Sequence, residues 1–341
     1  MYPWRFLSAA FASTLLGVVG LCADLSVQAH WPVGGGPLFD YLKVDPANHR
    51  LFAAHGPSVV VLDTDTGKVI GEISGLKRTH GIVLLPALGR GFITDGDLNV
   101  VVVFDLKTLA KIGQINSGGI KPDGIEYDPS SELLYVANGS SSDLVAIDPV
   151  TLSIKGKVHL EGKLEGLVLN GAGRLFVNTE DKSEVQVVDT ATMSRVAQWS
   201  VAPGEGGTGL AIDVPRHRLY SACGNRLLVI LDSDTGRLVG TVAIGEDPDG
   251  AAFDDKRGLI YTSNLDGSLS LIHVDSADHY SAAGSVETEF GARTLSLDEA
   301  SGRIYLPGGK FGPAPLPTPA VPEPKRALIE GTFEILMVGP K

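Results

Sequence analysis

Residues 122–160, PDGIEYDPSSELLYVANGSSSDLVAIDPVTLSIKGKVHL, contain four short β-rich runs joined by turns. In GIEYD the side chains alternate between the two faces of a strand, and LLYVAN, LVAIDP and LSIKGKV are further strand candidates. Asp128-Pro129-Ser130-Ser131 and the loop GSSSD supply the turn residues between them. One such sheet cannot bury both of its faces alone. The unit must therefore stack against other copies of itself.

Close variants of this unit recur along the chain, and two marks set their register. In six copies the third strand ends with an aspartate: Asp63, Asp105, Asp148, Asp189, Asp232 and Asp275. In the seventh copy Gly339 takes this place. An aromatic residue flanked by aliphatic residues marks the second strand at 40 to 44 residue intervals: Phe52, Phe92, Tyr135, Phe176, Tyr220, Tyr261 and Tyr305. Seven copies of four strands predict an all-β fold, a seven-bladed β-propeller of four-stranded antiparallel blades. A linear stack would need special end caps, which the sequence lacks.

The two ends of the chain predict how the ring closes. The seventh copy stops after its third strand, at Val338, and so lacks an outer strand. SVQAHWPVGG near the N-terminus resembles the fourth strand and exit turn of another copy, VIGEISGL. We therefore expect the N-terminal strand to join the last blade, which removes two open sheet edges.

Residues 1–29 predict a signal peptide. Arg5 gives the positive start, FLSAAFASTLLGVVGL the apolar core, and Val27-Gln28-Ala29 a small-residue cleavage site. Cleavage nearer Ala23 is the alternative, and it would leave more of the closing strand. The apolar run is short for stable membrane insertion. The sequence thus predicts a periplasmic or secreted protein in which residues 30–341 form a single propeller domain.

Composition and missing motifs narrow the function classes. A net charge of −12 opposes general affinity for nucleic acid or anionic lipid, because both need a positive field. Without the leader, Cys223 is the only cysteine, so no internal disulfide is possible and an inert thiol is expected. No phosphate loop, haem motif, zinc cluster or Gly-x-Ser-x-Gly elbow is present. The sequence favours a binding protein without a cofactor over an enzyme.

Several segments carry a family resemblance. Three segments resemble repeats of the bacterial YVTN-repeat, YncE-like β-propeller family: LFAAHGPSVVVLDTDTGKVIGEI, LLYVANGSSSDLVAIDPVTLSIKGKV and IYTSNLDGSLSLIHV. NTEDKSEV at 178–185, and GARTLSLDEASGRIYLP followed by FGPAPLPTP, are similar to an exported subgroup. The resemblance covers the chain after the leader. It implies the propeller fold and little biochemistry, because the family has no common reaction.

The residues that open the first strands are the candidate site. In a propeller these strands line the central channel, so their opening residues lie at one mouth. Counting back five positions from the start of each first turn gives the seven rim residues: Asp40, His80, Asp123, Glu165, Thr208, Asp249 and Arg293. Five of the seven precede glycine, which we expect to let the backbone bend tightly into the strand.

Two interpretations of the rim residues remain open. Each side chain can cap its own turn by accepting a hydrogen bond from a backbone N–H. Alternatively, the carboxylates converge on a cation, a cationic ligand or sugar hydroxyls, with Arg293 as a counter-charge. A metal such as calcium would then be held by oxygen ligands, and the candidate ligands are Asp123, Glu165 and Asp249.

Two loops add candidates on the same face. Glu180 and Asp181, in the loop after the fourth copy's second strand, are more charged than a turn requires and are candidate ligand contacts. In the seventh copy a proline-rich insertion, residues 310–331, replaces the corresponding loop. Its proline density favours an extended polyproline segment. We expect a lid, a docking strip, or an exposed excursion.

Three functions compete. The favoured hypothesis is an exported propeller that binds a small molecule or a periplasmic protein at the channel mouth. The alternative is a metal-assisted, lactonase-like hydrolase, by analogy with other propellers, in which Glu165 or Asp123 holds the ion and His80 or an ionised carboxylate acts as the base. A redox accessory subunit is a third possibility, but no residue pattern here ligates a cofactor.

Overall fold

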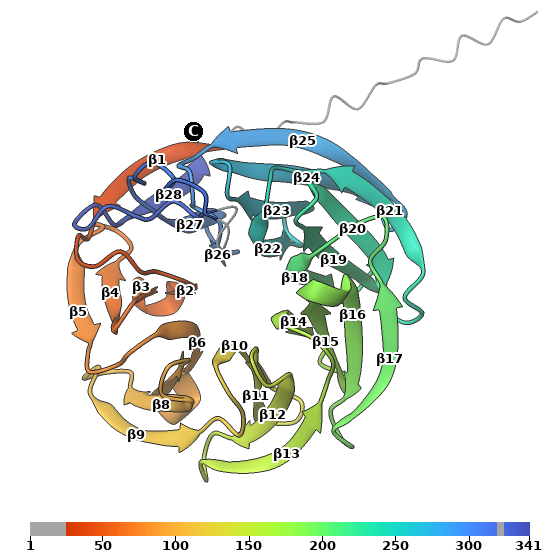
Figure 1. Cartoon of the computed structure of the whole chain (residues 1–341), viewed down its shortest axis with the longest axis horizontal. Coiled ribbons are helices and arrows are strands. Elements are labelled where there is room, and N and C mark those ends of the chain that lie inside the picture. Colours follow the sequence, from red (N-terminus) through yellow and green to blue (C-terminus); the bar gives the residue numbers. More distant parts are fainter. Residues whose placement is uncertain (1–24, 319–323) are drawn as a thin grey trace, which may run out of the picture.

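Seven sheets surround a central axis in the computed structural model, which describes residues 25–318 and 324–341 (Figure 1). Within these residues each sheet has four antiparallel strands, which run outward from the centre in chain order in six sheets, whereas in the seventh the N-terminal strand β1 (Leu25–Pro32) is outermost. The predicted seven-bladed propeller is therefore confirmed. No helix in the described residues is long and apolar enough to cross a bilayer.

Blades 1 to 4 follow one another in the chain. Blade 1 comprises β2 (Leu42–Asp45), β3 (Arg50–His55), β4 (Ser58–Asp63) and β5 (Val69–Ile73). Blade 2 comprises β6 (Thr79–Leu85), β7 (Arg90–Asp95), β8 (Val100–Asp105) and β9 (Lys111–Asn116). Blade 3 comprises β10 (Pro122–Asp128), β11 (Leu133–Asn138), β12 (Asp143–Asp148) and β13 (Ser153–His159). Blade 4 comprises β14 (Leu164–Leu169), β15 (Arg174–Thr179), β16 (Glu184–Asp189) and β17 (Ser194–Ser200).

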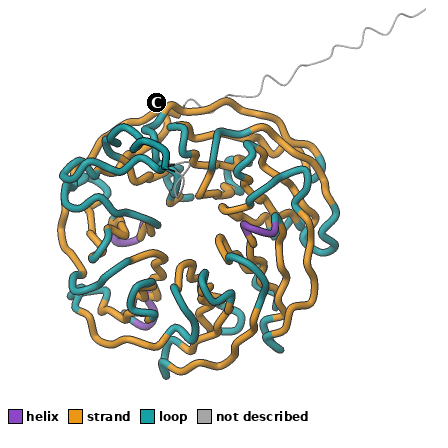
Figure 2. The backbone as a smooth tube through the Cα atoms, in the orientation of Figure 1, coloured by secondary structure: helices purple, strands orange, loops and turns teal. Residues whose placement is uncertain are grey.

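Blades 5 to 7 complete the ring. Blade 5 comprises β18 (Gly207–Asp213), β19 (Arg218–Cys223), β20 (Leu227–Asp232) and β21 (Leu238–Ala243). Blade 6 comprises β22 (Pro248–Asp254), β23 (Leu259–Asn264), β24 (Ser268–Ser276) and β25 (His279–Glu287). Blade 7 comprises β26 (Ser296–Asp298), β27 (Arg303–Gly308), β28 (Glu334–Pro340) and β1 (Leu25–Pro32). Short 3-10 helices lie at Pro46–Asn48 (η1), Pro86–Leu88 (η2) and Glu180–Lys182 (η3), purple in Figure 2.

The N-terminal strand closes the ring, as expected. β1 pairs antiparallel with β28, from Leu25 opposite Pro340 to Pro32 opposite Glu334. Leu25–Ala29, which the sequence assigned to the end of the leader, are thus part of this strand. The rest of the predicted leader, residues 1–24, lies outside the described residues.

The core lies between neighbouring blades. Each hydrophobic cluster of the described residues joins side chains from two adjacent blades, including one between blade 7 and blade 1. The seven aromatic residues that set the repeat register are at most 1% exposed. Burial of such a ring stabilises the fold by roughly 3 kcal/mol or more. Cys223 is buried between blades 4 and 5, where burial raises the pKa of its thiol to about 11.

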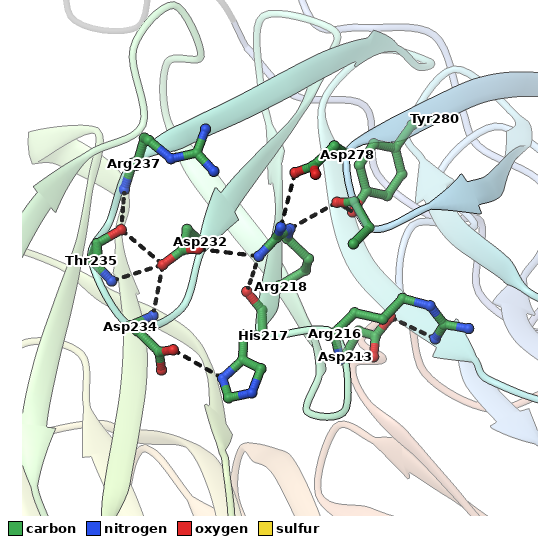
Figure 3. A network of polar contacts seen from close by, with 11 residues as sticks. Asp213, Arg216, His217, Arg218, Asp232, Asp234, Thr235, Arg237, Asp278 and Tyr280 are labelled. Atoms are coloured by element: carbon green, nitrogen blue, oxygen red, sulfur yellow. Dashed lines mark hydrogen bonds and ion pairs between the residues drawn. The ribbon is translucent and has the colours of Figure 1, made fainter.

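Arginines at the start of second strands link blade to blade. Each donates to a backbone carbonyl in the turn between the third and fourth strands of the next blade: Arg50 to Leu106, Arg90 to Pro149, Arg218 to Ala277 and Arg303 to Thr64. Arg218 also bonds Asp232 of its own blade and Asp278 of blade 6, where Tyr280 packs beside it (Figure 3). These contacts link adjacent blades on the face of the ring opposite the candidate site.

Candidate functional site

The seven rim residues line one cavity of about 200 Å³ at the mouth of the channel, here called the mouth cavity. Five of them lie in the first two residues of the inner strands β6, β10, β14, β18 and β22. Asp40 and Arg293 stand just before β2 and β26. The offset from each first turn therefore predicted their convergence correctly.

The glycines that follow five rim residues lie where the pairing of the inner strand shifts register, although none of the five has a positive φ. Such bulges bend a strand locally, and the glycines have a second role that the sequence does not predict. They allow close approach, because a Cβ on Gly209 would lie 2.8 Å from the Ala251 backbone nitrogen. A Cβ on Gly166 would lie 2.5 Å from the Thr208 carbonyl oxygen. Inner strands of adjacent blades thus pack backbone to backbone around the channel.

Tyr41 breaks this glycine pattern in blade 1. It stands where five other blades have glycine, and its side chain lines both the mouth cavity and a second cavity of about 350 Å³ in the channel. Burial raises the pKa of the Tyr41 hydroxyl well above its usual range, and the charges of Asp123 and Asp249 raise it further. The ring of Tyr41 therefore separates the mouth cavity from the channel beneath it.

The four rim carboxyl groups contact side chains rather than turn amides. Asp40 Oδ2 lies 2.5 Å from His80 Nδ1, and Glu165 Oε1 lies 2.6 Å from Lys163 Nζ. Asp249 Oδ2 lies 3.3 Å from Arg293 Nε. Among the described residues none of the four accepts a hydrogen bond from a backbone N–H, so turn capping does not explain them.

Thr208 is the exception among the rim residues. Its hydroxyl donates to the Pro248 carbonyl, 2.5 Å away in the next blade. Its own carbonyl accepts from the Asn178 amide at 3.1 Å. Thr208 therefore fixes the rim backbone.

Crowded carboxyl groups in the mouth cavity retain protons. Burial raises the pKa of Glu165 to about 8, with further contributions from Asp123 and Asp249, against the opposing effect of Lys163. Burial likewise raises the pKa of Asp249 to about 6, although Arg293 opposes it. Burial and the charge of Asp40 also raise the pKa of Asp123. Six carboxyl groups line the cavity against five lysine and arginine side chains and His80, and where the rim carboxyl groups crowd together a proton or a bound cation is favoured.

His80 is buried, 2% exposed, and makes only one short polar contact. Burial alone would lower its pKa, but the hydrogen bond to Asp40 and the charge of Asp123 outweigh burial and raise it. The other ring nitrogen, Nε2, has no hydrogen-bond partner among the described residues. A buried polar atom without a partner is costly, and at a cavity it points to a missing ligand or water.

A set of basic residues outside the rim was not found from the sequence. Arg78, Lys121 and Lys163 line the same cavity, each two positions before a rim residue of blades 2 to 4. Side chains two positions apart along an extended chain lie on the same side. The recurring patterns RTH, KPD and KLE are therefore a sequence signal for basic side chains beside the rim residues.

Of the two loop candidates, one reaches the cavity. Glu180 lines it and forms an ion pair with Lys163. Asp181 is exposed and accepts a hydrogen bond from the Lys163 backbone N–H at 2.7 Å, so it fixes the loop.

The structure groups the metal candidates differently from the prediction. Ligand atoms of Asp40, His80 and Asp123 all lie within 4.8 Å of one another. Of the predicted ligands Asp123, Glu165 and Asp249, only Asp123 belongs to this group. Two carboxylates and an imidazole suit zinc or manganese better than calcium, which prefers six or more oxygen ligands.

The proline-rich insertion borders the mouth. Lys325 lines the mouth cavity beside Phe39. Phe311, at the start of the insertion, meets Phe39 edge to face with the ring centroids 6.3 Å apart. Residues 319–323 of the insertion lie outside the described residues. The described parts of the insertion thus lie on the rim face.

Comparison with known proteins supports the fold. No protein-family model matches the chain. A segment of 119 residues, 33% of the chain, is 30% identical to Antigen Lp49 of Leptospira interrogans serogroup Icterohaemorrhagiae serovar copenhageni (strain Fiocruz L1-130). The chain spans only 26% of the length of that relative.

Solved structures match over nearly the whole chain. "Crystal structure of RRP9 WD40 repeats" has a TM-score of 0.75 at 10% identity and covers 93% of this chain and 98% of its own. "Structure of U3-55K" has a TM-score of 0.72 at 11% identity, with 92% and 98% covered. At these identities the likeness shows the fold alone. The chain is a seven-bladed β-propeller, and a third of it is similar in sequence to the leptospiral antigen.

Proposed function

We propose that this propeller is a binding protein whose mouth cavity takes the cationic group of a small ligand. The observation that carries the proposal is the convergence of Asp40, Asp123, Glu165 and Asp249 on one cavity of about 200 Å³. An ammonium or similar cation placed among them would take the place of the protons that the crowded carboxyl groups hold.

His80 supports the same proposal independently. Its Nε2 atom is buried and lacks a partner, while Nδ1 is held by Asp40. Buried polar atoms of this kind usually bond a water or a ligand, and outside the cavity Asn138, Tyr261 and Thr288 each hold another such atom. Convergent polar groups in a concave site are the usual form of a small-molecule pocket.

Isothermal titration calorimetry with butylammonium, at pH 8 and low salt, tests the proposal. We expect binding that Asp249→Asn weakens about tenfold or more, because a charged hydrogen bond contributes ~1.5–3 kcal/mol. Asp181→Asn is the matched control, because Asp181 lies outside the cavity and should leave binding unchanged. Equal loss in both variants, or no binding by the unmodified protein, would overturn the proposal.

We also infer that the protein is an exported member of the YVTN-repeat, YncE-like group. The leader features of residues 1–29 and the repeat segments quoted above support this inference. Cell fractionation, with mass spectrometry of the N-terminus, tests it. An uncleaved protein in the cytoplasm would contradict it.

A metal-assisted hydrolase is the second candidate, and the grouping of Asp40, His80 and Asp123 favours it. A divalent ion there would polarise a substrate carbonyl. Glu165, protonated up to a pH of about 8, is then better suited to donate a proton than to act as the base. Zinc or manganese that raises the melting temperature, with no rise in Asp123→Asn, would support this candidate.

A further inference from the structure

An apolar groove opens directly from the mouth cavity. The groove, here called the side groove, has a volume of about 550 Å³. The side groove and the mouth cavity are continuous, because four residues line both spaces: Phe39, Asp247, Arg293 and Lys325. The other apolar side chains that line it come from the segment before β2, from blade 6 and its exit loop, and from the insertion: Pro37, Leu38, Leu265, Phe290, Phe311 and Leu328.

The walls of the side groove are held by contacts among themselves. Phe290 and Phe311 meet edge to face, with ring centroids 5.2 Å apart. The Arg326 guanidinium lies 4.7 Å from the centroid of the Phe290 ring. Phe39 stacks on Phe333, a core residue, at 5.5 Å. The groove is therefore formed before any ligand enters, and its volume lies within the roughly 300–1,000 Å³ of small-molecule pockets.

The groove also exposes apolar surface to solvent. Leu38 is 45% exposed although it lines an aromatic wall. Contiguous exposed apolar surface beside a polar site is typical of a ligand groove.

We propose that the ligand is an amphiphilic amine, with its ammonium group in the mouth cavity and a hydrocarbon or aromatic tail in the side groove. This inference rests on the proposed function and names its ligand class. The continuity of the two spaces places head and tail in one molecule. The carboxylate of Asp247 stands at the junction, where the charged head of such a molecule would leave the groove, and Asp249 lies beyond it in the mouth cavity.

The charge at the junction distinguishes an amine from a fatty acid. Arg293 is already engaged by Asp249 at 3.3 Å and by Asp247 at 3.7 Å, so its charge is matched within the protein. An anionic head would enter a cavity that four carboxyl groups line. Of the other basic side chains, Arg78, Lys121 and Lys163 line the mouth cavity over blades 2 to 4, Arg326 lines the groove and lies over the Phe290 ring, and Lys325 lines both spaces.

Calorimetry with butyl-, hexyl- and octylammonium chloride, and with sodium octanoate, tests the inference on the whole protein. We expect affinity to rise about fourfold for each added methylene that is buried. Octanoate should bind at least tenfold more weakly than octylammonium. Leu38→Ser should flatten the dependence on chain length, because it should weaken octylammonium binding more than butylammonium binding. Leu316→Ser is the control, because Leu316 is 87% exposed and does not line the groove.

The outcomes separate this inference from the proposed function. Equal affinity for the three amines, with butylammonium binding that Asp249→Asn removes, would overturn the groove and keep the cation site. Tighter binding of octanoate than of octylammonium would overturn the amine. Absence of binding by any amine would overturn both. A thermal melt of Leu38→Ser that matches the unmodified protein excludes misfolding as the cause of a changed slope.

Discussion

His80 Nδ1 lies 2.5 Å from Asp40 Oδ2, although 40 positions separate the two residues in the chain. The bond crosses from blade 1 to blade 2, and Asp123 Oδ1 of blade 3 lies 3.8 Å from the same nitrogen. One imidazole thus joins the openings of three first strands. A close contact of this kind appears only when the ring of blades is formed.

The first prediction concerns this contact. Asp40→Asn should lower the pKa of His80, because the hydrogen bond to Asp40 helps to hold it above its ordinary value of 6.5. A raised folded-state pKa stabilises the protein below pH 6.5, and this stabilisation is lost as pH rises through the folded pKa. The substitution should therefore cost more stability at pH 5.5 than at pH 9. NMR titration of the His80 ring protons checks it, with Asp181→Asn as control, and an unchanged titration would contradict it.

The second prediction concerns Glu165, whose pKa rises from 4.5 to about 8 on folding. The folded state then holds a proton that the unfolded state releases, so stability falls as pH rises from 4.5 to 8. Glu165→Gln, which mimics the protonated acid, should match the unmodified protein near pH 4.5. At pH 9 it should be more stable by roughly 2–4 kcal/mol, since one pKa unit is ~1.4 kcal/mol. Urea unfolding at both pH values measures this, with exposed Glu72→Gln as control. A lower stability of Glu165→Gln at pH 9 would count against it.

The sequence predicts those parts of the site that recur in every blade, and it does not predict the parts that occur in one blade alone. The rim residues lie at a fixed offset from a recurring turn, so their convergence followed from the repeat alone. Tyr41 and the side groove do not repeat. Tyr41 replaces a glycine in one blade, and Phe39, Phe290 and Phe311 come from segments outside the strands that the insertion brings together. Contacts among such segments depend on tertiary packing, which no periodic pattern encodes.

The sequence also does not predict which side chains pair within the mouth cavity. The sequence showed which acids share the mouth but not that His80 pairs with Asp40 and Lys163 with Glu165. Those pairings depend on blade spacing and side-chain direction. The close approach at the glycines is not predicted for the same reason, because it is set by the neighbouring blade.

The third prediction tests the close approach of inner strands. Gly209→Ala should destabilise the protein by roughly 1–3 kcal/mol, because the new methyl group would meet backbone atoms of blade 6 that cannot move aside freely. Gly240→Ala, in outer strand β21, has no atom within 4 Å of its Cβ and should be neutral or stabilising by about 0.4–1 kcal/mol. Chemical denaturation of both variants gives the comparison. Equal effects would remove the close-approach explanation.

The fourth prediction concerns the arginines that link blades. Arg50 donates to the Leu106 carbonyl at 2.6 Å and pairs with buried Asp45 at 2.8 Å. Arg50→Ala leaves that carboxylate with only the Asn48 amide as a partner and should cost roughly 1–3 kcal/mol of unfolding free energy. Exposed Arg237→Ala should change stability by less than about 0.5 kcal/mol. If Arg237→Ala cost as much as Arg50→Ala, the contact between blades would not be the cause.

The fifth prediction concerns where the closing strand begins. Four residues of β1 pair with β28 before His30: Leu25 with Pro340, Ser26 with Gly339, Val27 with Val338 and Ala29 with Met337. The side chains of Leu25 and Val27 also pack against the core between blades 6 and 7. Cleavage after Ala29 would remove these pairs, whereas cleavage after Ala23 would keep them. A protein that starts at His30 should therefore melt several degrees below one that starts at Asp24, because an open edge and apolar surface replace a paired strand. Differential scanning calorimetry compares the two, and mass spectrometry of the exported protein should find the earlier cleavage. Equal melting temperatures would mean that residues before His30 contribute nothing to closing the ring.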